Sequence, residues 1–171
     1  GPIGNLTAQV AKVLGARDVM ITDIDQRRLD FAKQCGIEHC INTKNRSLKN
    51  VIEGIFGKRK ADIIIDCAAT KTTFATILEA ARPRSTIVIS GNFKAPVEFE
   101  VTMIQRQEIT MLGHMMYVKE DFSDAIRLFA EDKIRVNGFI TQHFKFKDYD
   151  KALKYIDEHP NEVMKVLIEM E

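Results

Sequence analysis

Hydrophobic positions along the first sixty residues follow the spacing of helices that alternate with short strands. Apolar residues recur every third or fourth position from Ile3 to Leu14, which predicts a first helix. A strand is expected at Asp18–Ile21, a helix capped by Asp25 follows it, and a short strand is expected at Cys40–Asn42. An amphipathic helix is then predicted over residues 47–57.

The middle of the chain continues this alternation with more strongly apolar strands. Ala61–Asp66 contains three consecutive isoleucines, so we expect a strand that is buried on both faces, as in a parallel sheet. A helix that begins at Thr72 or Thr73 and a strand at Thr86–Ile89 come next. Strands and helices in this order predict an α/β fold with a Rossmann-like, doubly wound parallel sheet.

The strict alternation ends after residue 92. Val97, Phe99 and Val101 alternate with two glutamates, the pattern of a half-exposed strand. A strand is predicted at Ile109–Leu112. The tail is then expected to form a helix, a strand, a second helix and a last strand near residues 122–130, 140–144, 149–156 and 166–168.

The first residues carry the lower part of a dinucleotide-binding motif. Gly1-Pro2-Ile3-Gly4 leads into the first helix, whose unpaired N–H groups can receive a pyrophosphate. Asp23 follows Gly4 by 19 residues, close to the roughly 20 expected for an acid that binds the ribose hydroxyls. A carboxylate there repels a 2′-phosphate, so NAD is favoured over NADP. Arg28 can either reach the ribose or its phosphate or lie in solvent.

The complete G-x-G-x-x-G pattern needs another glycine two positions before Gly1 and a hydrophobic strand ahead of it. We therefore expect a sheet that lacks its first strand. The usual strand order leaves the resulting slot between the strands at Asp18–Ile21 and Ala61–Asp66. The chain is expected either to associate with other copies around that slot or to be a piece of a longer protein. Direct pairing of those two strands would contradict this expectation.

Composition and charge narrow the classes of partner. The 25 basic and 24 acidic residues are well mixed and give a formal net charge of +1, which offers no electrostatic reason for a nucleic-acid partner. No apolar run approaches the roughly 20 residues of a membrane span, and the first residues do not resemble a signal peptide, so we expect a cytoplasmic protein without a membrane partner. Cys35, Cys40 and Cys67 lack C-x-x-C spacing, which predicts free thiols and no metal site in this chain.

The sequence resembles the coenzyme domain of the zinc-containing medium-chain alcohol/polyol dehydrogenases, which include sorbitol, threonine and sugar-acid dehydrogenases. The resemblance covers the whole chain and is most specific in the first 35 residues. The segments that carry it are Gly1–Gly4, Ala8–Lys12, Leu14–Ala16, Thr22–Asp23, Arg28–Leu29, Ala32–Lys33, Ile63–Cys67, Ile87–Gly91 and Lys165–Ile168.

The resemblance implies an NAD-binding domain over residues 1–116 and a C-terminal return segment, residues 117–171, that packs on a catalytic domain. That catalytic domain would precede residue 1 and hold the zinc, so no catalytic residue is expected here. Val97–Val101 resembles the edge strand through which family members form homodimers or homotetramers. The implied cofactor contacts are Gly1, Pro2, Ile3 and Gly4 at the pyrophosphate, Asp23 and Arg28 at the adenosine ribose, and Cys67, Ala68, Ser90, Gly91 and Met115 along the path to the nicotinamide.

The activity implied for the intact protein is hydride transfer between a secondary alcohol, such as a polyol or sugar acid, and NAD, while this chain alone is expected to be inactive. A zinc-free quinone reductase is the nearest alternative enzyme, but such enzymes usually prefer NADPH, which Asp23 disfavours. A methyltransferase fits poorly with the order of elements after Ser90. A non-catalytic nucleotide-binding regulatory module fits the first half and leaves residues 117–171 unexplained.

Overall fold

The computed structural model describes residues 1–170, which divide into two compact units. The terminal unit contains Gly1–Cys40 and the chain from Leu128 onward, and the central unit contains Ile41–Arg127. Strands pair in three sheets, with the orders β1-β2, β3-β4-β5 and β6-β7. The β3-β4-β5 and β6-β7 pairs are parallel, which confirms the predicted α/β class.

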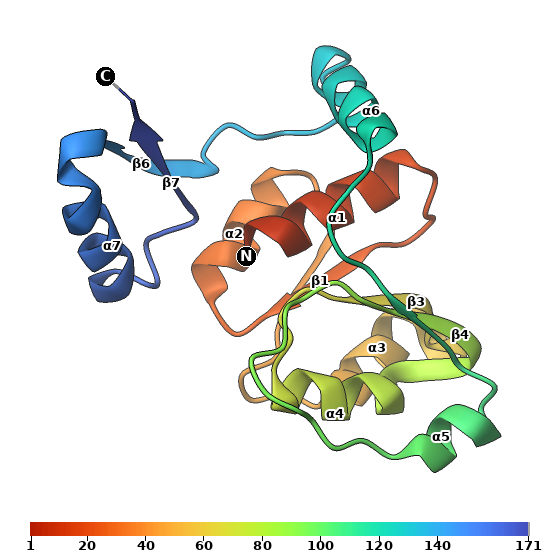
Figure 1. Ribbon diagram of the computed structural model, residues 1–171. Helices are drawn as coiled ribbons and strands as arrows, with labels where there is room; N and C mark the ends of the chain where they lie inside the picture. The colour runs from red at the N-terminus through yellow and green to blue at the C-terminus, as the bar shows by residue number, and fades with distance from the viewer. Residues whose placement is uncertain (171) are drawn as a thin grey trace. The chain divides into compact units, whose positions relative to one another are not determined.

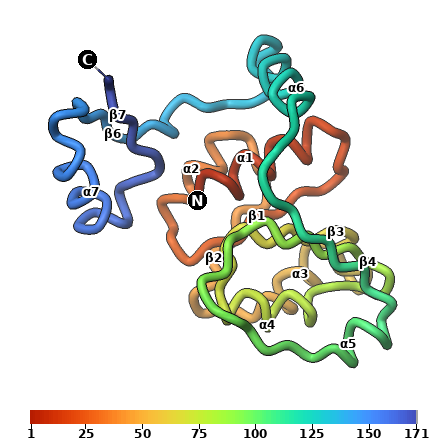
Figure 2. The backbone as a smooth tube through the Cα atoms, in the orientation of Figure 1, coloured from red at the N-terminus to blue at the C-terminus, as the bar shows by residue number. Residues whose placement is uncertain are grey.

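The terminal unit begins with α1 (Pro2–Val13), β1 (Met20–Asp23), α2 (Gln26–Gln34) and the first two residues of β2 (His39–Asn42). Asp25 caps α2 as predicted, because its side chain accepts a hydrogen bond from the Arg27 N–H. Leu29 and Ala32 lie on the buried face of α2. Both helices contact β1, and Figure 2 follows the chain from β1 through α2 to β2.

The tail of the chain completes the terminal unit. It contains the end of α6 (Lys119–Ala130), β6 (Ile140–Lys145), the 3-10 turn η2 (Phe146–Asp148), α7 (Tyr149–Glu158) and β7 (Lys165–Glu169). Helix α7 connects the two parallel strands and contacts both of them, at the blue end of the chain in Figure 1.

Hydrogen bonds and ring packing join this tail to the first forty residues. Gln9 Oε1 accepts from the Arg135 N–H at 2.7 Å and its Nε2 donates to the Arg135 carbonyl at 3.0 Å, so one buried side chain pairs with both backbone groups. Phe31 packs edge-to-face on Phe139 with ring centroids 5.0 Å apart. Gly138 lies under Phe31 at φ +91°, where a Cβ would come within 2.8 Å of the ring.

The central unit contains α3 (Leu48–Phe56), the 3-10 turn η1 (Gly57–Arg59), β3 (Ala61–Asp66), α4 (Lys71–Ala80), β4 (Ala81–Ile89), α5 (Val101–Arg106) and β5 (Thr110–Gly113). Ser47 caps α3, and Thr70 caps α4 through a reciprocal pair with Thr73. The core of this unit consists of Ile77, Leu78, Ala81, Ile87 and Ile109. Helices α3 and α4 contact each other beside this sheet (Figure 1).

The expectation that both faces of β3 are buried is wrong. Ile63 is 63% exposed and Ile65 is 38% exposed, whereas Ile64, on the opposite face, packs against the core. Alternate residues of a strand point to opposite faces. Within the central unit, α4 therefore covers only the Ile64 face, and β3 lies at the edge of its three-stranded sheet. Strands β1 and β3 belong to different sheets, as the expected slot requires.

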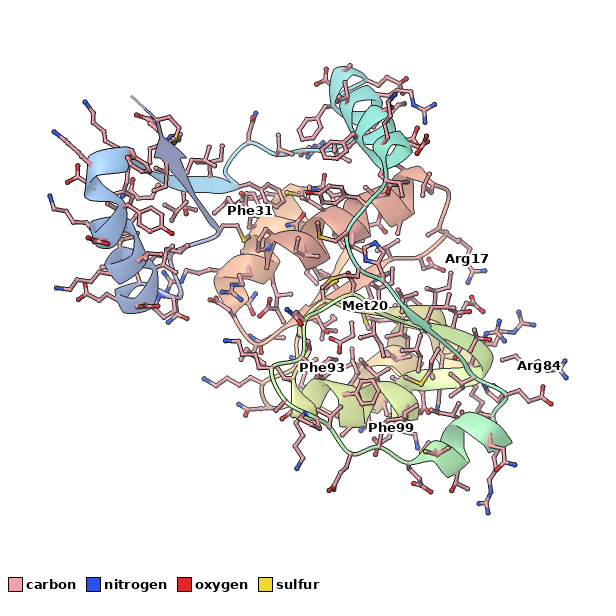
Figure 3. All side chains as sticks on the ribbon, viewed as in Figure 1. Arg17, Met20, Phe31, Arg84, Phe93 and Phe99 are labelled. Atoms are coloured by element: carbon pink, nitrogen blue, oxygen red, sulfur yellow. The ribbon has the colours of Figure 1, made fainter. Side chains whose placement is uncertain are left out.

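The prediction of a strand at Val97–Val101 is also wrong. Residues 97–100 are in no strand, and Val101 is the first residue of α5. Glu100 is extended, at φ −85° and ψ 97°, and directly precedes α5, so within residues 1–170 the alternating pattern does not form a paired strand. Phe99, labelled in Figure 3, packs edge-to-face on Phe74 with centroids 5.3 Å apart. Among the described residues, no helix is long and apolar enough to cross a membrane.

Candidate functional site

The terminal unit brings together three of the residues predicted to bind a cofactor. The Gly1 nitrogen donates to Asp23 Oδ2 at 3.0 Å. A Cβ placed on Gly1 would lie 3.9 Å from Nη1 of Arg28, so the guanidinium lies beside the start of α1. Gly1, Asp23 and Arg28 therefore form one group at the end of β1, although Asp23 and Arg28 follow Gly1 by more than twenty positions.

Several interactions determine the charge of Asp23. Burial, the largest influence, would raise its pKa, but hydrogen bonds from the Asp25 N–H and the Gly1 nitrogen, together with the nearby charge of Arg28, outweigh it. The pKa of Asp23 is therefore lower than the usual 3.8. Because the side chain keeps 14% of its surface exposed, the ionised carboxylate can accept hydrogen bonds from a ligand.

Arg28 is held by neighbouring groups and does not extend freely into solvent. Its Nε lies 4.0 Å from Asp25 Oδ2, and its Nη2 donates to the Pro160 carbonyl at 3.3 Å. These contacts connect α2 to the turn before β7. The guanidinium therefore lies between the first helix turn, a carboxylate and the tail, and its side chain remains 36% exposed.

The first turn of α1 has the geometry of an anion site. The first intrahelical bond runs from the Asn5 N–H to the Gly1 carbonyl at 3.1 Å, so the N–H groups of Ile3 and Gly4 precede the helical hydrogen-bond series. Pro2 opens the helix and has no N–H to leave unpaired. Ile3 is 57% exposed and Asn5 is buried, so the helix packs through the face opposite Ile3.

The central unit brings together the residues predicted to flank the nicotinamide path. Strands β3 and β4 pair Asp66 with Ile89, so the turns that follow both strands lie next to each other. The N–H groups of Ser90 and Gly91 donate to the Asp66 carbonyl at 3.0 and 2.8 Å. Asp66 Oδ1 accepts from the Ala68 and Ala69 N–H groups at 2.9 and 3.1 Å.

A pocket of about 320 Å³ opens at the ends of β4 and β5. Its size is at the lower end for small-molecule sites, so it fits one end of a dinucleotide and not the whole molecule. Ser90 Oγ lies 3.3 Å from His114 Nδ1 across it. The lining residues are Ile89, Ser90, Gly91, Asn92, Gly113, His114 and Met115.

Three of the predicted residues, Ser90, Gly91 and Met115, line this pocket, and Cys67 and Ala68 lie in the adjoining turn after β3. Sequence reasoning places His114 at the carboxyl end of a predicted strand, where ligands bind, without assigning it a cofactor contact, and it leaves Asn92 out of the predicted site. Their position directly after the ends of two neighbouring parallel strands is the signal that could have found them.

Side chains that could bind a metal ion do not cluster in the described part of the chain. Within residues 1–170, no three His, Cys, Asp or Glu side chains form a group that could hold a metal ion. Cys35, Cys40 and Cys67 form no disulfide within residues 1–170. Burial raises the pKa of both the Cys35 and the Cys40 thiol. The side chains of residues 1–170 therefore do not fit a zinc site.

Comparison with known proteins identifies the family. The zinc-binding dehydrogenase family model matches residues 2–131. D-xylulose reductase of Saccharomyces cerevisiae is 32% identical over 99% of this chain, and sorbitol dehydrogenase of Halalkalibacterium halodurans is 30% identical over 98% of it. The match covers 49% of either relative, so the chain spans about half the length of the curated relatives it matches.

Solved structures support the same fold. An Escherichia coli CFT073 alcohol dehydrogenase, solved in complex with NADH, superposes with a TM-score of 0.88 and 26% identity over 99% of this chain and 50% of its own. An Escherichia coli dehydrogenase of unknown specificity gives a TM-score of 0.91 at 21% identity over 99% of this chain and 49% of its own, which supports the fold alone. The chain therefore belongs to the zinc-binding dehydrogenase family and matches the Rossmann-like, coenzyme-binding half of its medium-chain polyol dehydrogenases.

Proposed function

We propose that this chain is the coenzyme-binding part of an NAD-dependent, zinc-dependent dehydrogenase that transfers hydride between a secondary alcohol and NAD. The observation that carries the proposal is the ionised Asp23 carboxylate at the end of β1, beside the Gly1 turn and Arg28. Relatives named sorbitol dehydrogenase and D-xylulose reductase support a polyol or a related sugar acid as the substrate class.

The terminal unit is proposed to bind the adenosine and pyrophosphate end of NAD. Asp23 would accept hydrogen bonds from the ribose hydroxyls, and its negative charge would repel the 2′-phosphate of NADP. The N–H groups of Ile3 and Gly4 would face the pyrophosphate at the positive end of α1, with Gly1 and Pro2 forming the turn before them. Arg28 would add a positive charge on the ribose side of this turn.

The central unit is proposed to hold the nicotinamide end. The pocket at Ser90, Gly91 and Met115 has the volume for one ring system, and the turn at Cys67–Ala68 adjoins Gly91. When bound, the nicotinamide supplies the carbon that accepts the hydride. The role of this chain is to fix the ring and to exclude water from one side of it, with small residues and backbone groups.

The catalytic zinc is proposed to be held by residues outside this chain, where it would polarise the substrate oxygen. This proposal explains why the chain alone is expected to be inactive. We further propose that residues 1–116 form the NAD-binding domain and that residues 117–171 return to pack on the catalytic domain. The contact of Gln9 with the Arg135 backbone supports a tail that returns to the first helix.

Pairing of two copies through residues 97–101 is proposed for a homodimer or homotetramer. The support is that residues 97–100 are in no strand and that Glu100, directly before α5, has an extended backbone, which can pair with another chain. The lack of a disulfide among the three cysteines of residues 1–170 supports a reducing compartment such as the cytoplasm. A quinone reductase or a regulatory nucleotide-binding module is not favoured by relatives that carry polyol dehydrogenase and reductase names.

Titration of NADH and NADPH into the chain, followed by calorimetry or fluorescence, tests the proposal. NADH should bind more tightly than NADPH, and Asp23→Ala should weaken NADH about ten- to hundredfold, because a hydrogen bond to a charged group contributes about 1.5–3 kcal/mol. Asp18→Ala, which removes another acid of the same unit outside this group, is the matched control and should leave the affinity unchanged. A preference for NADPH would contradict the NAD assignment, and binding of neither cofactor would contradict coenzyme binding by this chain.

A further inference from the structure

Asp66 is the last residue of β3 and connects the two turns of the central unit through separate atoms. Its carboxylate Oδ1 accepts from the Ala68 and Ala69 N–H groups, and its carbonyl accepts from Ser90 and Gly91. Four backbone N–H groups from two turns therefore converge on a single residue. Replacing the side chain would remove the bonds to Ala68 and Ala69, whereas the backbone carbonyl would keep its bonds to Ser90 and Gly91.

The two turns also touch directly. A Cβ placed on Gly91 would come within 2.7 Å of the Ala69 Cβ and 2.9 Å of the Ala69 nitrogen. Ala69 has a φ of +51°, a left-handed conformation that is costly for alanine. The hydrogen bond from its N–H to Asp66 Oδ1 is part of what holds it there. The position of the 67–69 turn therefore depends on the Asp66 side chain.

Only one of the two oxygens of the Asp66 carboxylate has hydrogen-bond partners among the described residues. The residue is only 4% exposed, and its Oδ2 is buried without a hydrogen-bond partner among the described residues. Leaving a buried acceptor unpaired costs about 1–3 kcal/mol, more for a charged group. This cost offsets much of what the two Oδ1 bonds contribute. Besides what the two Oδ1 bonds contribute to stability, an acid at this position fixes where the 67–69 turn lies.

We propose that Asp66 is a positioning residue for the nicotinamide end of the coenzyme. It acts by holding the 67–69 and 90–91 turns at the spacing that the bound ring requires, and it does not touch the ring itself. This inference rests on the proposed coenzyme function. It assigns a role to a residue that the sequence indicates only as the end of an apolar strand.

The test compares two ligands that differ in one part. ADP-ribose carries the adenosine and pyrophosphate end without the nicotinamide, so it depends on the terminal unit, whereas NADH depends on both units. Asp66→Ala removes the Oδ1 acceptor and should weaken NADH about tenfold while leaving ADP-ribose within about twofold, where tenfold corresponds to about 1.4 kcal/mol. The fluorescence of the bound dihydronicotinamide should shift towards that of free NADH, because the ring loses its fixed surroundings.

Asp66→Asn is the matched control, because it keeps the shape and one acceptor oxygen without the charge. It should restore NADH affinity and the fluorescence of the bound ring to nearly the original values. If Asp66→Ala does not fold, Asp66→Glu makes the same comparison, since it keeps the carboxylate but displaces the acceptor from the turn. Binding of ADP-ribose reports in every variant that the rest of the chain is folded.

The outcomes separate the two claims. Equal weakening of both ligands, no weakening of either, or Asp66→Asn behaving like Asp66→Ala would overturn the positioning role and leave coenzyme binding intact. Equal affinity of the unchanged chain for NADH and ADP-ribose would also overturn the positioning role. The nicotinamide would then gain no binding free energy from the two turns. Failure of the unchanged chain to bind either ligand would overturn the proposed function together with this inference.

Discussion

The terminal and central units carry their candidate coenzyme contacts in different ways. In the terminal unit, the contacts depend on charged side chains, with Asp23 and Arg28 gathered near Gly1. In the central unit, they depend on backbone groups and small residues, with Gly91 close against Ala69 and four N–H groups directed at Asp66. Under the proposed function, one end of the coenzyme would be recognised by charge and the other by close fit.

This difference predicts different responses to mutation. A site built on close approach fails when volume is added, because backbone atoms cannot move aside cheaply. A site built on charge responds to pH and to the loss of a single donor or acceptor. Substitutions in both units and a pH titration test this difference between the units.

Gly91→Ala should have the largest effect on stability. The new methyl group would meet both the Cβ and the backbone nitrogen of Ala69 at less than 3 Å. The free energy of unfolding, measured by urea denaturation, should fall by about 1–3 kcal/mol, the usual cost of overpacking. Gly113→Ala is the matched control at the end of β5, where a Cβ has nothing within 4 Å, and it should change stability by less than about 0.5 kcal/mol. Equal effects would show that close approach does not define this site.

The stability of the terminal unit should depend on pH through Asp23. The pKa of this carboxyl is lower in the folded chain than its ordinary 3.8, so the unfolded chain binds the proton more readily. The stabilisation is therefore complete above the unfolded pKa and is lost as the pH falls through the folded one. The difference in the free energy of unfolding between the unchanged chain and Asp23→Asn should shrink below about pH 4. A difference that stays constant across this range would contradict the charged environment of Asp23.

Arg28→Ala should give the smallest effect, a loss of about three- to tenfold in NADH affinity, because its side chain remains partly exposed and solvent screens its charge. Arg27→Ala, at the exposed neighbouring position of α2, is the control and should change the affinity by less than about twofold. Calorimetric titration measures both variants. If the two arginines had the same effect, net charge alone would explain the result and the position of Arg28 beside Gly1 would be irrelevant.

The sequence predicted the charged site better than the close-fitting one, for a physical reason. Asp23 follows an apolar strand at a characteristic distance from a glycine turn, and both properties are local. Asn92 is missing from the predicted site and His114 is placed at a strand end without a cofactor contact, because only the pairing of β4 and β5 brings their turns into one pocket. The Val97–Val101 pattern has the alternation of a strand, but a strand also needs a neighbour, which a local pattern does not supply.

The sequence by itself determined the α/β class, the order of helices and strands, the cap of α2 at Asp25, the half-motif at Gly1–Gly4 and the acid at Asp23, because periodicity, capping and spacing act within a few residues. Only the tertiary structure decided which face of β3 is covered, which turns touch, and that Arg28 lies beside Gly1. These features depend on contacts between segments that are tens of residues apart. Such contacts form when strands pair and helices pack, and no local pattern in the chain records them.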